Sequence, residues 1–129
     1  MTSVAEMIAQ ANARVPTIAV GEALGPVSDA GTVFVDLRDS AELAREGMIP
    51  GALHVNRGVL EFALDPTSSY HQPALAAGKR IVLYCGSGGR SALAADTARA
   101  MGVPRVAHLG GGFKAWLAAG GPRVDSGSA

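Results

Sequence analysis

The chain has 129 residues, of which 48% are hydrophobic and 17% are charged, and its 11 basic and 11 acidic residues leave no net charge. This length predicts one domain over residues 1–125, followed by a loose tail over residues 126–129. The balanced charge argues against nucleic acid or a membrane surface as a partner, and no apolar run approaches the roughly 20 residues of a membrane-spanning helix.

Hydrophobic periodicity and turn residues predict that strands and helices alternate along the chain. An amphipathic helix is expected over residues 3–14, with Val4, Met7, Ile8 and Ala11 on one face. The expected strands are residues 17–20, 32–35, 53–55, 80–84 and 105–109. Further helices or helical turns are expected at residues 21–24, 41–45, 58–64, 73–77, 91–101 and 113–119.

This alternation predicts an α/β fold with three layers, in which helices cover both faces of a central, mainly parallel five-stranded sheet. The strand at residues 32–35 is apolar on both faces, as a buried parallel strand should be. Functional sites of such sheets lie at the carboxyl ends of the strands. Residues 36–38, Arg57, the loop after Tyr84 and the turn at Gly110 should therefore lie at one end of the molecule.

The loop after Tyr84 is the segment most suited to chemistry, because three of the four residues after Cys85 are glycine. Glycine lets a backbone curl so that successive N–H groups point at one centre and attract an anion. The following helix adds its own unpaired N–H groups and the positive end of its dipole, and Arg90 adds a permanent charge. Such surroundings favour a cysteine thiolate. The alternative is a glycine-rich turn around an inert, buried cysteine.

The spacing of this loop separates two kinds of chemistry. Four residues stand between Cys85 and Arg90, whereas loops of the tyrosine-phosphatase kind have five. The loop also lacks the Gly-Lys-Ser/Thr ending of a nucleotide-binding loop. A loop of this length is suited to a smaller group than phosphate, such as one sulfur atom bonded to Cys85.

Cysteine and histidine usage limits the other possibilities. Cys85 is the only cysteine, so no internal disulfide can form, and a lone thiol suits a reducing compartment such as the cytoplasm. The first ten residues lack the basic and apolar blocks of a secretory signal peptide. His54, His71 and His108 are too scattered to form a ligand set, so no metal is expected. We expect His108 to be a strand residue with a backbone partner.

Four segments resemble the rhodanese family, the single-domain sulfurtransferases. They are Phe34 to Glu42, Ile49 to Val55, Tyr84 to Ser91 and His108 to Trp116. Matches run in the family's order from residue 33 to residue 120. Met48 stands where the family usually has histidine before Ile-Pro-Gly, a position that we expect to be structural.

The resemblance implies a sulfurtransferase that needs no cofactor. Cys85 would take a sulfane sulfur from a donor such as thiosulfate, carry it as a persulfide and pass it to a nucleophilic acceptor, which is cyanide, a thiol or a protein cysteine. The persulfide would be bound by the loop residues Gly86, Ser87, Gly88, Gly89, Arg90 and Ser91. Two rival interpretations are a cysteine-dependent phosphatase or arsenate reductase, and a non-catalytic interaction module of the same fold.

Several of these side chains have two expected roles. Arg90 would hold the loop and stabilise an anion, or else pair with a nearby carboxylate. Asp36 and Arg38 would form a structural ion pair that supports the loop. Arg57 would meet an anionic donor or lie on the surface. Ser91 is expected to cap the following helix, with a hydrogen bond to the persulfide as the alternative.

Overall fold

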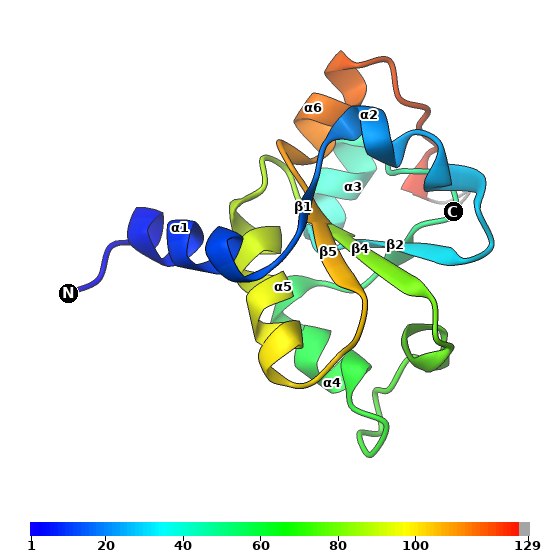
Figure 1. The fold of residues 1–129 in the computed structure, drawn as a ribbon. Coiled ribbons are helices and arrows are strands. Elements are labelled where there is room, and N and C mark those ends of the chain that lie inside the picture. The colour runs from blue at the N-terminus through cyan, green and yellow to red at the C-terminus, as the bar shows by residue number, and fades with distance from the viewer. Residues whose placement is uncertain (127–129) are drawn as a thin grey trace.

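The computed structural model describes residues 1–126 and shows a parallel five-stranded sheet between two layers of helices (Figure 1). The strands are β1 (Thr17–Ile18), β2 (Thr32–Asp36), β3 (Leu53–His54), β4 (Arg80–Tyr84) and β5 (Val106–Leu109). Their order across the sheet is β1-β5-β4-β2-β3, and every pairing is parallel. The predicted three-layer α/β class is therefore confirmed, and β4 lies at the centre of the sheet.

Helices lie on both faces of the sheet (Figure 1). One face carries α1 (Val4–Arg14), α4 (Leu60–Leu64) and α5 (Gly89–Ala100). The other face carries α2 (Val20–Ala23), α3 (Ser40–Glu46) and α6 (Gly112–Ala118). Short 3-10 turns occupy Pro26–Ser28, Arg57–Val59 and Pro73–Ala76.

The alternation of side chains along β4 explains why this strand is apolar throughout. Ile81 and Leu83 point into the core beneath α4 and α5, whereas Val82 and Tyr84 point into the core beneath α3 and α6. Successive side chains of a strand point to opposite faces, so a strand covered on both sides must be apolar at every position. By the same alternation, Cys85 lies on the α5 side of the sheet.

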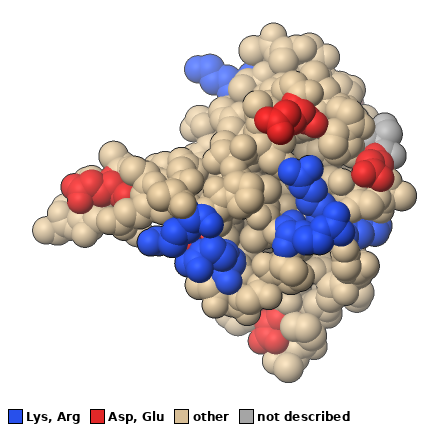
Figure 2. All heavy atoms as spheres, in the orientation of Figure 1, with Lys and Arg blue, Asp and Glu red and all other residues tan. Residues whose placement is uncertain are grey.

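The expected apolar face of α1 is largely exposed. Of the expected α1 face, only Ala11 is buried, while Val4 is 62% and Met7 45% exposed, because the first turns of α1 project beyond the edge of the sheet (Figures 1 and 2). Met101, which was expected to end the helix that begins at residue 91, is exposed and lies just beyond α5. The buried face of α5 is formed by small residues, which let the helix lie close to the strands: Ser91, Ala92, Ala94, Ala95 and Ala98.

Some boundaries also differ from those expected. The first strand is only two residues long, because Val20 already begins α2. Helix α5 begins at Gly89, so its first turn includes two residues that were expected to belong to the loop or the cap. Near the end of the chain, Met48 and Val124 exchange two backbone hydrogen bonds of 2.9 Å. Of the expected loose tail, residues 127–129 lie outside the described residues.

Charged side chains are spread over the surface in small groups. On the face drawn in Figure 2, basic groups are separated by uncharged surface and do not form a continuous patch. Of the helices within residues 1–126, none combines the length and the hydropathy needed to cross a bilayer.

The start of α6 fixes the backbone of the loop that follows β4. The N–H groups of Phe113 and Lys114 donate to the carbonyl oxygens of Cys85 and Gly86 at 2.8 and 3.0 Å. Gly112 has a φ of 63°, and a Cβ there would lie 2.6 Å from both of these oxygens. Only glycine allows this approach, which turns the loop carbonyls toward α6.

A Gly112→Ala substitution should therefore lower the free energy of unfolding by about 2 kcal/mol or more, because it combines a left-handed backbone with a backbone clash. Gly120→Ala is the matched control, since Gly120 has a φ of 78° with open space around its missing Cβ. It should lose only about 1 kcal/mol. Urea unfolding of the three proteins measures the difference, and equal losses would contradict the close approach at Gly112.

Candidate active site

The Cys85 sulfur lies at the N-terminus of α5, against backbone N–H groups. Cys85 follows Tyr84 directly and is 1% exposed. Its Sγ accepts hydrogen bonds from the N–H of Gly88 at 3.2 Å and of Ser91 at 3.4 Å. The 12-residue helix α5 directs the positive end of its dipole at the same atom. Negative charge on this sulfur is therefore favoured by groups that are already in place before any reaction.

The structure brings some of the predicted loop residues to the sulfur and leaves others around it. Gly86 is bound to α6 through its carbonyl oxygen, and the Ser87 side chain is exposed. Gly88 adopts a φ of 109°, which favours glycine and directs its N–H at Sγ. Gly89 and Arg90 form the first two positions of α5.

Ser91 corrects one expectation. It does not cap α5, because Gly88 occupies the N-cap position and Ser91 is the third residue of the helix. Its fully buried hydroxyl lies 3.6 Å from Cys85 Sγ, 3.3 Å from the Gly88 carbonyl oxygen and 3.0 Å from His108 Nδ1. The side chain therefore faces the Cys85 sulfur.

Arg90 is bound to a carboxylate on α3. Its Nη1 and Nη2 donate to Oε1 and Oε2 of Glu42 at 2.8 and 2.9 Å. Glu42 also completes a capping box with Asp39 at the start of α3. The hydrogen bond from Arg90 lowers the pKa of Glu42 to about 2. The pKa of Arg90 is raised, chiefly by the same hydrogen bond and in smaller part by the nearby charge of Cys85.

Asp36 and Arg38 form a fully buried pair beneath the loop. Arg38 Nε and Nη2 donate to the two Asp36 oxygens at 3.0 and 2.8 Å, and Nη2 also donates to the Gly47 carbonyl oxygen at 2.7 Å. Burial lowers the pKa of Arg38, but the Asp36 carboxylate more than compensates, so the net shift is upward. The guanidinium carbon lies 4.3 Å from the ring centre of Phe113, whose N–H binds the Cys85 carbonyl.

Arg57 is placed on the flank of the molecule. Its Nη1 pairs with Glu61 at 2.9 Å, and its Nη2 lies 3.5 Å from the Thr97 hydroxyl on α5. Thr97 is six residues beyond Ser91, or about 9 Å along the helix. The structure thus brings Arg57 against α5, and its contact with an anionic donor stays a prediction.

His108 is the residue near this site that the sequence prediction missed. It is a strand residue, as expected, but its ring has side-chain partners: Nδ1 contacts the Ser91 hydroxyl, and Nε2 lies 2.7 Å from Asn12 Oδ1 and 3.1 Å from Thr17 Oγ1. Burial lowers the pKa of His108. The sequence feature that could have indicated this position is that His108 lies near the carboxyl end of a predicted strand, where functional sites of parallel sheets are found.

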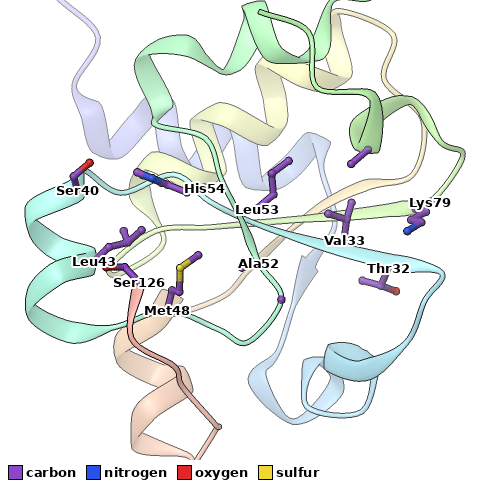
Figure 3. Close-up of a pocket in the computed structure, with 12 residues that line it drawn as sticks. Thr32, Val33, Ser40, Leu43, Met48, Ala52, Leu53, His54, Lys79 and Ser126 are labelled. Atoms are coloured by element: carbon purple, nitrogen blue, oxygen red, sulfur yellow. The ribbon is translucent and has the colours of Figure 1, made fainter. Parts of the chain in front are cut away.

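One hollow of the surface lies away from Cys85. It has a volume of about 650 Å³ and runs along the β3 edge of the sheet, from Lys79 and Thr32 at one end to Ser40 and His54 at the other (Figure 3). A hollow of about 470 Å³ lies beside the cysteine loop, with Gly88, Asn12 and His108 in its lining. Within residues 1–126, no three His, Cys, Asp or Glu side chains are grouped to hold a metal ion.

Comparison with known proteins identifies the class to which this fold and site belong. The rhodanese-like domain family matches residues 19–119, so the chain belongs to that family. The predicted family resemblance is confirmed.

Two relatives show which activities are named within the family. The chain is 38% identical over 92 residues to a sulfurtransferase of Allochromatium vinosum, covering 71% of this chain and 78% of that protein. It is 30% identical over 108 residues to the human thiosulfate:glutathione sulfurtransferase, covering 79% and 93%. The chain spans only 57% and 48% of the lengths of two further curated relatives. These matches support sulfurtransferase chemistry at the level of the family.

A solved structure with 42% identity resembles the whole chain. It is a Rhodopseudomonas palustris protein described as of unknown function and a possible tyrosine phosphatase. Its TM-score is 0.93, and the match covers 96% of each chain.

The Arg90–Glu42 pair should make stability depend on acid pH. The pKa of Glu42 is lowered to about 2 in the folded protein, against about 4.3 in an unfolded chain. The stabilisation is therefore complete above about pH 4.3 and is lost as the pH falls toward 2. Glu42→Gln should cost about 1 kcal/mol or less at neutral pH, because the Arg90 side chain is 44% exposed.

Urea unfolding of wild type and Glu42→Gln across this pH range tests the prediction, and the two stabilities should converge near pH 2. Glu22→Gln is the control, because Glu22 has no ion-pair partner among residues 1–126. A difference between wild type and Glu42→Gln that stays constant with pH would contradict the assignment.

Proposed function

We propose that this protein is a sulfurtransferase that carries a sulfane sulfur as a persulfide on Cys85. The observation that supports the proposal most directly is the position of Sγ, which accepts two backbone hydrogen bonds at the positive end of α5. A thiolate is the reactive form of cysteine, and it is stabilised at such positions. The lone thiol also suits a reducing compartment such as the cytoplasm.

The reaction has two half-reactions that both use Sγ. With thiosulfate as donor, the Cys85 thiolate forms a bond to the outer sulfur, the sulfur–sulfur bond of the donor breaks, and sulfite leaves with the electron pair. A nucleophilic acceptor, either cyanide or a thiol, then forms a bond to the outer sulfur of the persulfide. The electron pair of the broken bond returns to Sγ, so one transfer is divided into two easier steps.

The loop stabilises negative charge in both half-reactions. The amides of Gly88 and Ser91 contact Sγ in the resting protein, and their positions are fixed by the hydrogen bonds that connect the loop to α6. Donors that are already in place stabilise a developing anion without having to reorganise. Arg90 contributes a permanent charge beside the loop while it remains bound to Glu42.

Phosphatase chemistry is the rival that the Rhodopseudomonas palustris protein suggests. Two features argue against it. The loop has one residue fewer than the phosphatase spacing, and both terminal nitrogens of Arg90 bind Glu42 and are not free to take a phosphate. Arginine binds phosphate best when two parallel N–H groups are free.

Intact-protein mass spectrometry after incubation with thiosulfate should show a gain of one sulfur atom, which cyanide then removes as thiocyanate. Cys85→Ala should show neither the gain nor thiocyanate formation above background, because no other thiol is present. Arg57→Gln is an informative companion, since weaker thiosulfate binding in that variant would show that Arg57 meets the donor.

The same preparation should be incubated with p-nitrophenyl phosphate. Turnover that disappears in Cys85→Ser would favour the phosphatase. Failure to take up sulfur from thiosulfate, polysulfide and glutathione persulfide, together with no phosphate hydrolysis, would favour a non-catalytic module.

A further inference from the structure

A line of hydrogen bonds leads from the reactive sulfur to the outer surface of α1. Cys85 Sγ lies 3.6 Å from Ser91 Oγ, which lies 3.0 Å from His108 Nδ1, and His108 Nε2 lies 2.7 Å from Asn12 Oδ1. The four residues come from the end of β4, from α5, from β5 and from α1. The sulfur chemistry proposed above makes no use of His108 on β5 or of Asn12 on α1.

The partners fix the direction in which each proton points. Asn12 Oδ1 is an acceptor, and it also accepts the Thr17 hydroxyl at 3.3 Å. His108 Nε2 therefore carries the ring proton, and Nδ1 presents its lone pair to Ser91. The Ser91 hydroxyl has two acceptors within reach, His108 Nδ1 at 3.0 Å and the Gly88 carbonyl oxygen at 3.3 Å. When it donates to the nearer one, Nδ1, an oxygen lone pair faces the Cys85 thiol.

The surroundings of the ring keep it neutral in the resting protein, because burial opposes its charged form, and a thiolate formed nearby would offset that cost. His108 is 2% exposed, and each element that packs against the ring contributes an uncharged partner: Asn12 from α1, Thr17 from β1 and Ser91 from α5. Among the described residues, no carboxylate or cation is hydrogen-bonded to the ring. The titratable group that faces the ring is Cys85, which is separated from it by the Ser91 hydroxyl.

We propose that Ser91 and His108 form a proton relay that ionises Cys85, an inference that deepens the sulfurtransferase proposal and rests on it. The thiol proton moves from Sγ to Ser91 Oγ while the Ser91 proton moves to His108 Nδ1. The neutral thiol and imidazole thereby become a thiolate and an imidazolium, and no other reactant is needed. Ser91, which contacts the sulfur, is the catalytic residue, and His108 is a positioning residue that acts through it.

The outer end of the relay can be altered without disturbing the cysteine loop. Asn12 is exposed on α1, which precedes the family-matched segment of residues 19–119. Together with His108 it lines the hollow of about 470 Å³ beside the loop. A carboxylate at position 12 would contact Nε2 and stabilise an imidazolium, as an opposite charge at short range does.

The test is the pH dependence of Cys85 alkylation by iodoacetamide, which requires no sulfur donor. In His108→Gln, which cannot take up a proton, the midpoint of the pH–rate profile should rise and alkylation at mildly acidic pH should slow about tenfold, equivalent to one pH unit. Asn12→Asp should shift the midpoint in the opposite direction and speed alkylation roughly threefold or more. A merely structural role for His108 would not give opposite shifts.

Ser91→Ala should slow Cys85 alkylation as His108→Gln does. The double variant should be only slightly slower than either single variant, because both substitutions interrupt the same line of hydrogen bonds. His71→Gln is the matched control, since His71 contacts the Ala63 carbonyl oxygen and no group of the relay. An unchanged midpoint in folded His108→Gln, or no acceleration in Asn12→Asp, would overturn the relay. Asn12→Asp keeps the test decisive if the buried substitution prevents folding.

The sulfur-loading and alkylation experiments separate the two proposals. Opposite midpoint shifts without sulfur uptake would support the relay and reject the sulfurtransferase. Sulfur uptake with an unchanged midpoint in His108→Gln would support the sulfurtransferase and reject the relay.

Discussion

The hydrogen bonds between two backbone amides and the Cys85 sulfur are the interaction on which the site depends. Amide groups point inward at the sulfur only if the carbonyl groups of the same loop point elsewhere. Helix α6 satisfies this condition by donating its first N–H groups to the carbonyl oxygens of Cys85 and Gly86, at an approach that only Gly112 permits. The site is therefore a product of two helix N-termini, one directed at the sulfur and one directed at the loop carbonyls.

Charged pairs connect this loop to the other elements at the same end of the sheet. Arg90 joins α5 to α3 through Glu42, and the buried Arg38 joins the end of β2 to Gly47 and to the ring of Phe113. A buried ion pair gains little net stability unless its remaining hydrogen bonds are satisfied, and here Arg38 donates to Asp36, Glu46 and a carbonyl oxygen. These contacts connect the loop of Cys85 to α3 and to the end of β2.

Much of the architecture was predictable because it depends on local patterns. The expected strands are mostly apolar runs bounded by turn residues, and the loop of Cys85 was recognisable from its glycines and from the family resemblance. The position of the Ser91 hydroxyl and the side-chain partners of His108 were not predictable. Asn12 and His108 are 96 positions apart, so their contact depends on how α1 packs beside β5. The exposed face of α1 escaped prediction for the same reason, since periodicity does not show whether a neighbouring surface exists.

The position of α1 affects how far the chain can be shortened without changing the surroundings of His108. Residues 19–119 match the family, yet the partners of the His108 Nε2 atom are Asn12 and Thr17, which both precede that segment. A chain trimmed to residues 19–119 would retain the loop of Cys85 and lose β1 from the sheet edge, and the His108 imidazole would lose its contacts with Asn12 and Thr17. In the proposed relay, the unit that acts on Cys85 thus extends beyond the family-matched segment, because α1 supplies the partner of His108 Nε2.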